Sequence, residues 1–188
     1  MVLVTGLVVS GCKKKSDDDD DAVTPTPTDT CGTPLMTFMA DGHVLTYDFS
    51  YLGTTITMTH TIATYGTTGQ FKTTLASSLL NGTVYSKECG GWLYRASTDA
   101  LVNTNKYRKS TTAVGDTWTF VEGSTSAVYL VLAKNQSITT PAGTFACDKI
   151  SYAQTGTLNV DTIWFNNAVG DVKYSGTLID YTLKTKNF

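Results

Sequence analysis

"HVLTYDFSYLGTTITMTHTIATY", residues 43–65, alternates apolar and polar side chains on either side of a Leu-Gly pair. Alternation with a period of two is typical of a β-strand that buries one of its faces. A two-residue loop at Leu52-Gly53 would bring the apolar residues of both strands onto the same face of a hairpin. That face is predicted to carry His43, Leu45, Tyr47, Phe49 and Tyr51 from the first strand and Ile56, Met58, His60 and Ile62 from the second.

Further alternating segments follow this hairpin at short intervals, and pairs such as Asn81-Gly82 mark tight turns between them. Residues 71–80 also fit a short helix, because apolar residues recur four apart, but we favour a strand. Residues 101–114 have the weakest pattern and are predicted to hold a long loop or a short helix. Between Phe145 and Ile150 the apolar parity changes, which predicts a β-bulge near Asp148.

Composition agrees with a fold made of strands. The chain has 188 residues, enough for one domain, and 35 of them are Thr, which suits a pleated and partly solvated surface. The sequence shows neither a strand–helix alternation nor a coiled-coil heptad. Repeated strands with glycine-rich turns therefore predict an all-β protein with an antiparallel meander sheet.

The first residues have the pattern of a targeting signal. Residues 2–9 are apolar and lead into Val9-Ser10-Gly11-Cys12, which resembles the lipobox of bacterial lipoprotein signal peptides. The resemblance implies that residues 1–11 are a signal peptide and that Cys12 becomes the acylated first residue. Residues 1–11 lack the positive charge that usually opens such a peptide, and a short buried strand or helix is the alternative. So short a run falls below the roughly 20 residues that span a membrane as a helix.

The charged tract after Cys12 extends this interpretation. Ser16 with Asp17, Asp18, Asp19, Asp20 and Asp21 resembles the export signal of surface lipoproteins in Bacteroidota. That resemblance implies a protein anchored by lipid in the outer membrane and displayed on the cell surface; the periplasmic face is the alternative. A run of like charges also serves as a solvated linker. We divide the chain into the signal peptide (1–11), the lipidated tract with a Pro/Thr spacer (12–30) and one β domain (31–188).

A second resemblance concerns the domain itself. The segments "TTPAGTFACDKISY" (139–152) and "IWFNNAVGDVKYSG" (163–176) are similar to a domain of unknown function common in exported Bacteroidota proteins. "YSKECGGWLY" (85–94) fits the Cys-turn-aromatic hairpin of that domain. Such domains are similar in shape to the LolA and LolB lipoprotein carriers, which implies a strongly curved, half-open barrel. The family carries no established catalytic residues to transfer.

The sequence contains no catalytic signature. Nucleophile-elbow, zinc-protease, phosphate-loop and dinucleotide motifs are all absent, so we predict neither an enzyme nor a cofactor. His43 and His60 share the predicted apolar face without an acidic partner on it, which favours buried or rim histidines over a metal site. Outside residues 13–21 the chain holds 11 basic and 11 acidic residues, and nucleic acid is therefore not an expected partner.

After lipidation of Cys12, three cysteines remain: Cys31, Cys89 and Cys147. Outside the cytoplasm we expect one disulfide and one buried thiol. Cys147 alternates with Phe145 within a predicted strand and can simply be buried. We favour a bridge between Cys31 and Cys89, and a Cys89–Cys147 bridge is nearly as plausible.

Two functions follow as expectations. The first is a non-catalytic, lipid-anchored surface protein that acts as a binding or accessory module for an envelope protein or a glycan. The second is a carrier of a lipid or other apolar ligand in a half-barrel of the LolA/LolB kind. Trp92, Trp118, Trp164 and ten Tyr could line such a groove, although aromatic residues are also common in a β core.

Overall fold

The computed structural model describes residue 31, residues 35–66 and residues 69–188. The predicted signal peptide (1–11), the lipidation site Cys12, the export tract Ser16 with Asp17–Asp21 and the spacer that follows lie outside the described residues.

The described residues form twelve antiparallel strands in one sheet. The strands are β1 (Val44–Tyr51), β2 (Thr54–Thr64), β3 (Gln70–Ala76), β4 (Gly82–Cys89), β5 (Trp92–Ala96), β6 (Lys106–Lys109), β7 (Thr117–Glu122), β8 (Thr125–Thr140), β9 (Gly143–Gln154), β10 (Val160–Asn166), β11 (Gly170–Ser175) and β12 (Ile179–Lys186). No helix occurs among these residues, and accordingly none that is long and apolar enough to cross a membrane.

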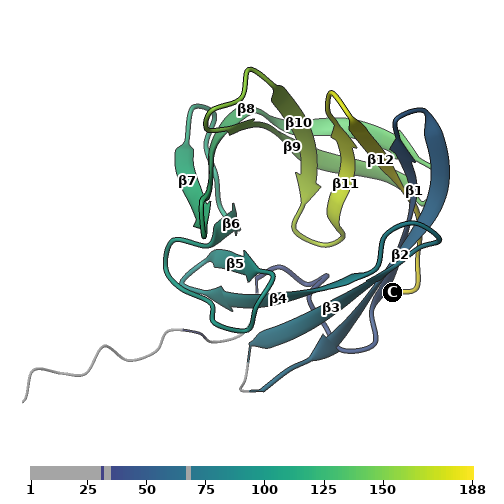
Figure 1. Cartoon of the computed structure of the whole chain (residues 1–188), viewed down its shortest axis with the longest axis horizontal. Helices are drawn as coiled ribbons and strands as arrows, with labels where there is room; N and C mark the ends of the chain where they lie inside the picture. Colours follow the sequence, from purple (N-terminus) through teal and green to yellow (C-terminus); the bar gives the residue numbers. More distant parts are fainter. Residues whose placement is uncertain (1–30, 32–34, 67–68) are drawn as a thin grey trace, which may run out of the picture.

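The sheet curls into a nearly closed barrel (Figure 1). Strands that are consecutive in the chain pair with each other, except β6 and β7, and β1 pairs with β12; β6 and β7 are therefore the two edges of the sheet. These edges meet where the Val121 amide donates to the Thr104 carbonyl (2.9 Å) and the Asn105 side chain donates to the Val121 carbonyl (2.7 Å). The predicted all-β, strongly curved meander is confirmed, and the barrel is closed further than a half-open one.

The hairpin predicted from residues 43–65 is confirmed. Its turn residues Leu52 and Gly53 have φ angles of 47° and 81°, as a two-residue turn that matches the twist of the strands requires. The resulting register pairs Tyr47 with Met58. Four of the apolar side chains from this hairpin are buried beside Tyr47, whereas Tyr51 at the turn is exposed: Leu45, Phe49, Met58 and Ile62.

Three local expectations have different outcomes. Residues 71–80 contain the strand β3, as favoured, and no helix. Residues 101–114 contain the four-residue strand β6, which the weak pattern failed to indicate. The expected irregularity near Asp148 is present, but its extra residue lies on the opposite strand β8, where the register shifts between Ala133 and Gln136. Asn135, between them, has a φ of 54°.

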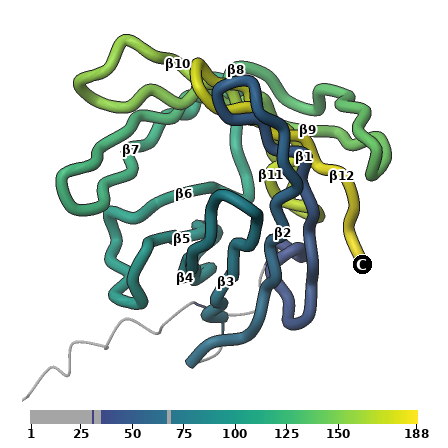
Figure 2. The backbone as a smooth tube through the Cα atoms, turned by 45° about the vertical axis from the view of Figure 1, so that its right-hand side comes forward, coloured from purple at the N-terminus to yellow at the C-terminus, as the bar shows by residue number. Residues whose placement is uncertain are grey.

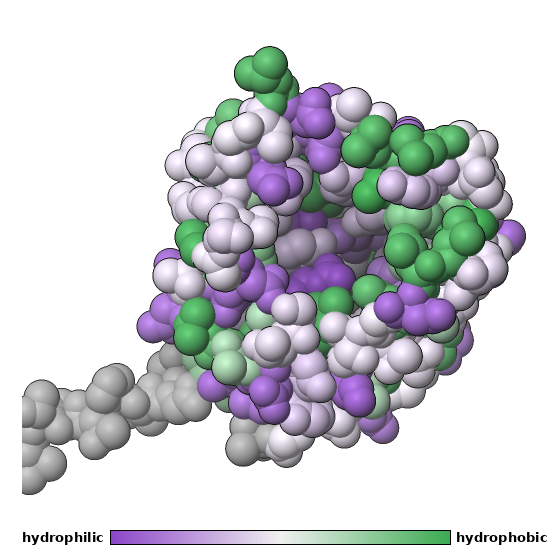
Figure 3. Space-filling model, in the orientation of Figure 1, coloured by the Kyte–Doolittle hydropathy of each residue, from purple (hydrophilic) through white to green (hydrophobic). Residues whose placement is uncertain are grey.

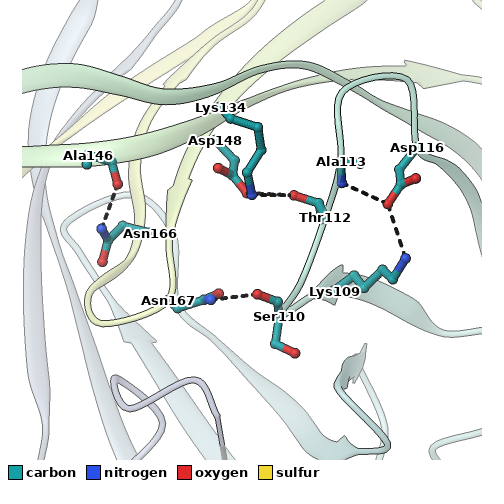
Figure 4. A network of polar contacts seen from close by, with 10 residues as sticks. All are labelled: Lys109, Ser110, Thr112, Ala113, Asp116, Lys134, Ala146, Asp148, Asn166 and Asn167. Carbon is teal, nitrogen blue, oxygen red and sulfur yellow. Dashed lines mark hydrogen bonds and ion pairs between the residues drawn. The ribbon is translucent and has the colours of Figure 1, made fainter.

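A polar network fastens the loop between β6 and β7 to the neighbouring strands (Figure 4). Lys134 forms an ion pair with Asp148 (2.5 Å), and the Thr112 hydroxyl donates to the same carboxylate (2.7 Å). From the β10–β11 turn, the Asn167 side chain donates to the Ser110 carbonyl (2.7 Å). Side-chain contacts of this loop, rather than a continuous ladder of strand hydrogen bonds, thus help to join the two edges of the sheet.

The two ends of the barrel differ. Because the strands alternate in direction, the turns after the odd-numbered strands lie together at one end, here called the open end, and Figure 2 shows several of them on its left side. The other end, here called the closed end, is covered by residues 35–42. Met36 and Phe38 from this plug are 0% and 8% exposed. A Cβ atom at Gly170 would lie 3.1 Å from the Phe38 ring, so the β10–β11 turn requires glycine at this position.

Two links hold the plug against β4. Cys31 and Cys89 form a disulfide across 58 residues. The neighbouring Glu88 carboxylate, which is 4% exposed, accepts hydrogen bonds from the amides of Leu35 (2.7 Å) and Met36 (3.0 Å). A buried carboxylate needs such donors, and here they come from the plug itself.

Candidate functional site

The interior of the barrel is not completely filled by side chains. Barrel diameter grows with strand number, and about eight strands are already just wide enough for side chains to fill the interior or to hold one small ligand. This barrel has twelve strands and contains two neighbouring cavities of about 180 and 310 Å³, both lined by Arg95 and Tyr107. Together they fall within the range of small-molecule sites, about 300–1,000 Å³.

The smaller cavity lies on the β1–β5 side of the barrel and has a largely apolar wall. Its polar lining is restricted to a few groups, among them Thr73, Ser86, Arg95 and Asp171. The apolar part of the wall includes Leu45, Phe49, Met58, Ile62, Leu75 and Leu93. This combination of an apolar wall and a few polar groups is typical of a ligand pocket.

The larger cavity lies toward the open end and is lined mainly by aromatic residues. Ser97 and Glu122, which stand where β5 and β7 reach that end, also line it. The Glu122 carboxylate accepts hydrogen bonds from the Ser97 amide and hydroxyl, both at 2.6 Å. The aromatic residues are Tyr107, Phe120, Tyr129, Tyr152 and Tyr174.

The open end is hollow and has an apolar rim. Figure 3 shows this face with hydrophobic residues around a central depression and hydrophilic residues deeper inside. Exposed apolar side chains lie in or beside the turns of this end: Leu52, Leu79, Leu80, Val102, Leu158 and Leu178. Exposed apolar side chains that cluster in one region mark a surface that contacts a ligand, a membrane or another protein.

A buried ion pair crosses the interior. Arg108 is 0% exposed, and its guanidinium donates to the Asp171 carboxylate at 3.0 Å and to the Tyr107 carbonyl at 2.8 Å. The other Asp171 oxygen accepts hydrogen bonds from the hydroxyls of Tyr107 (2.5 Å) and Tyr181 (3.0 Å). Burial alone would raise the pKa of Asp171, but the Arg108 charge and the Tyr107 hydrogen bond outweigh it and lower the pKa. Both oxygens of this carboxylate are therefore already occupied.

Arg95 has a different environment. Its guanidinium carbon lies 4.7 Å from the centre of the Tyr107 ring, and the side chain is half-buried. Unlike that of Arg108, the Arg95 guanidinium forms no hydrogen bond or direct ion pair with a described residue, although the nearby Asp171 charge helps to raise its pKa. Arg95 pairs in register with Ser86 of β4, which places the two side chains next to each other on the inner face. The interior thus holds one cation whose donors contact no carboxylate among the described residues.

His60 and three tyrosines also line the smaller cavity, and all of them are uncharged. Burial, with a further contribution from the Arg95 charge, lowers the pKa of His60 to about 3, so this imidazole is neutral at physiological pH. Burial also raises the pKa values of Tyr47, Tyr107 and Tyr181, which keeps their hydroxyls protonated. These groups can donate or accept hydrogen bonds, but none of them supplies a charge to the cavity.

The structure places the other candidate residues as follows. Cys147 is a free, buried thiol, and burial raises its pKa to about 12. His43 donates a hydrogen bond from Nδ1 to the Phe38 carbonyl (3.0 Å) and stacks on Phe188, away from the cavity wall that contains His60. Among the described residues, no group of three or more potential metal ligands occurs.

The tryptophans do not line the cavities. Trp118 is buried and stacks on Tyr129, and Trp92 packs edge-on against it. Trp164 lies between the side chains of Lys149 and Lys173, whose ammonium groups are 5.6 and 5.2 Å from its ring centre. Tyrosines, rather than the tryptophans, therefore form the aromatic lining.

Sequence reasoning missed the residues that give the interior its charge. Asp171 follows Gly170, a pairing typical of turns, and Arg108 lies in the segment with the weakest pattern. Arg95 alternates with Leu93, which is buried at 2% exposure, and this alternation was the one signal that could have placed Arg95 on the inner face. Neither a known protein family, nor a curated protein, nor a solved structure matches the chain.

Proposed function

We propose that the protein binds a small apolar or amphipathic molecule inside its barrel and acts as a carrier rather than as an enzyme. The observation that carries this proposal is the unfilled interior, whose two cavities share Arg95 and Tyr107. An apolar molecule that moves from water into such a space gains about 25 cal/mol for each Å² of surface it buries.

The two ends of the barrel support the same function. The plug and its disulfide cover one end, so a ligand would pass through the open end, where the apolar rim lies. With the predicted acyl anchor at Cys12, the carrier would stand on the outer membrane, with its export to the cell surface directed by Ser16 and Asp17–Asp21. The expected module for an envelope protein or a glycan remains a prediction that no particular feature of the described residues favours.

Binding of N-phenylnaphthylamine, a neutral dye that fluoresces in apolar surroundings, tests the proposal. We expect saturable binding of the dye to the wild-type protein. In Leu75→Trp the indole would occupy the smaller cavity, and the affinity should fall by about tenfold or more. Thr74→Trp, one residue away on the outer face of the same strand, is the matched control and should bind the dye as the wild type does.

Thermal melting of each variant would show that the barrel is folded in every titration. Absence of saturable dye binding to the folded wild type would contradict the proposal. Equal affinities of the wild type and a folded Leu75→Trp variant would exclude the smaller cavity, which Leu75 lines, as the binding site of the dye.

A further inference from the structure

We infer that the barrel selects amphiphiles with one acidic head group, of the fatty-carboxylate class, and that Arg95 and Ser86 bind the carboxylate. The inference rests on the proposed function and adds the chemical class of the ligand. It starts from the charges of the interior and the size of the smaller cavity.

The acidic groups near the cavities all direct their carboxylate oxygens to other partners, so none of them contacts the Arg95 guanidinium. Asp171 uses both carboxylate oxygens for Arg108, Tyr107 and Tyr181. Glu122, the acidic residue of the larger cavity, bonds to Ser97. Glu88, farther toward the closed end, bonds to the plug amides. Burial alone would lower the pKa of Arg95, but the surrounding tyrosines and Asp171 outweigh burial and raise it, so the guanidinium stays charged. Its N–H donors are used by no described residue and can therefore bind an anionic ligand.

The groups around Arg95 are suited to a carboxylate. A guanidinium presents planar donors that match a carboxylate in a bidentate arrangement. Ser86, the register partner of Arg95, is 3% exposed and lines the same cavity, as does Thr73, which is 7% exposed. Their hydroxyls can donate to an anion beside Arg95. Because His60 is neutral, it adds no competing charge to this site.

The rest of the cavity is suited to a single chain. Beyond these polar groups, the wall is formed by aliphatic, methionine and phenylalanine side chains, including Met58, Ile62 and Leu93. A volume of about 180 Å³ is below the range of typical ligand sites, so it leaves room for one short chain and not for a lipid with two chains. Decanoate and decanol are suitable probes, since they share a chain and differ in the charge of the head group.

Displacement of N-phenylnaphthylamine by decanoate and by decanol, at about pH 8 where the carboxylate is ionised, tests this inference. We expect the wild type to bind decanoate about 10- to 100-fold more tightly than decanol, as a charge-assisted hydrogen-bonded pair would provide. Arg95→Gln should remove this preference by weakening decanoate alone. Lys173→Gln, which removes one positive charge beside Trp164, should leave the preference unchanged.

Arg95→Gln loses the contact with the Tyr107 ring but breaks no direct ion pair, so we expect a folded variant with a modest change in melting temperature. If that variant does not fold, Ser86→Ala takes its place, with an expected loss of about threefold for decanoate and none for decanol. Equal affinities for decanoate and decanol would overturn the inference and leave the proposed function standing. A preference that survives in Arg95→Gln or disappears in Lys173→Gln would also overturn it. Failure of the dye itself to bind would overturn the proposed function and the inference together.

Discussion

Replacing Asp171 with Asn should lower the free energy of unfolding by about 3–5 kcal/mol, because it leaves a buried guanidinium without its countercharge. Arg108 is 0% exposed and has Asp171 as its ion-pair partner, while Arg95 adds a second positive charge nearby. The hydroxyls of Tyr107 and Tyr181 would also lose a charged acceptor. Urea denaturation followed by circular dichroism measures the change.

Two further variants separate this effect from a general loss of packing. The double variant Asp171→Asn with Arg108→Met should be more stable than Asp171→Asn alone, because it removes the pair instead of breaking it. Asp48→Asn breaks an exposed ion pair, in which the side chains of Asp48 and Lys184 are 40% and 42% exposed. This substitution should lower the free energy of unfolding by less than about 1 kcal/mol. A similarly small cost for Asp171→Asn would contradict the buried ion pair described here.

Replacing both Cys31 and Cys89 with Ser should lower the free energy of unfolding by about 2–4 kcal/mol. The disulfide closes a loop with a sequence separation of 58 and fixes the start of the plug to β4. Its loss increases the conformational freedom of the unfolded chain, while the Glu88 hydrogen bonds still hold the plug in the folded barrel. Urea denaturation of the oxidised wild type and the double variant gives the difference.

Peptide mapping without reductant tests the pairing itself. A peptide linked through Cys31 and Cys89 is expected, with Cys147 alkylated only after denaturation because it is 0% exposed. Recovery of a Cys89–Cys147 peptide, or no change in stability in the double variant, would contradict this assignment.

The fold could be predicted from the sequence where one face of a strand is buried and the other is exposed. In residues 43–65 the alternation sets both the strands and the register, since a slip by one residue would expose the whole apolar face. This pattern fades in β6, which has only four residues and lies at an edge of the sheet. Closure of the barrel also depends on contacts between distant segments, such as Val121 with Thr104, which no local pattern records.

The site was much less predictable. A charged residue on the inner face of a wide barrel breaks the apolar alternation, so Arg95 and Asp171 look like surface or turn residues in the sequence. The ion pair of Arg108 with Asp171 joins positions 63 residues apart, and the sequence around either residue does not indicate the pairing. Departures from local sequence rules are expected at functional sites, and the three interior charges Arg95, Arg108 and Asp171 fall into this group.

A single-chain amphiphile inside the barrel, with its acidic head at Arg95, can be located with decanoate that is brominated at its last carbon. We expect anomalous crystallographic density for the bromine inside the smaller cavity, near Met58, Ile62 and Leu93, with the carboxylate beside Arg95 and Ser86. Bromine density only on the outer face of the barrel would rule out binding in the interior.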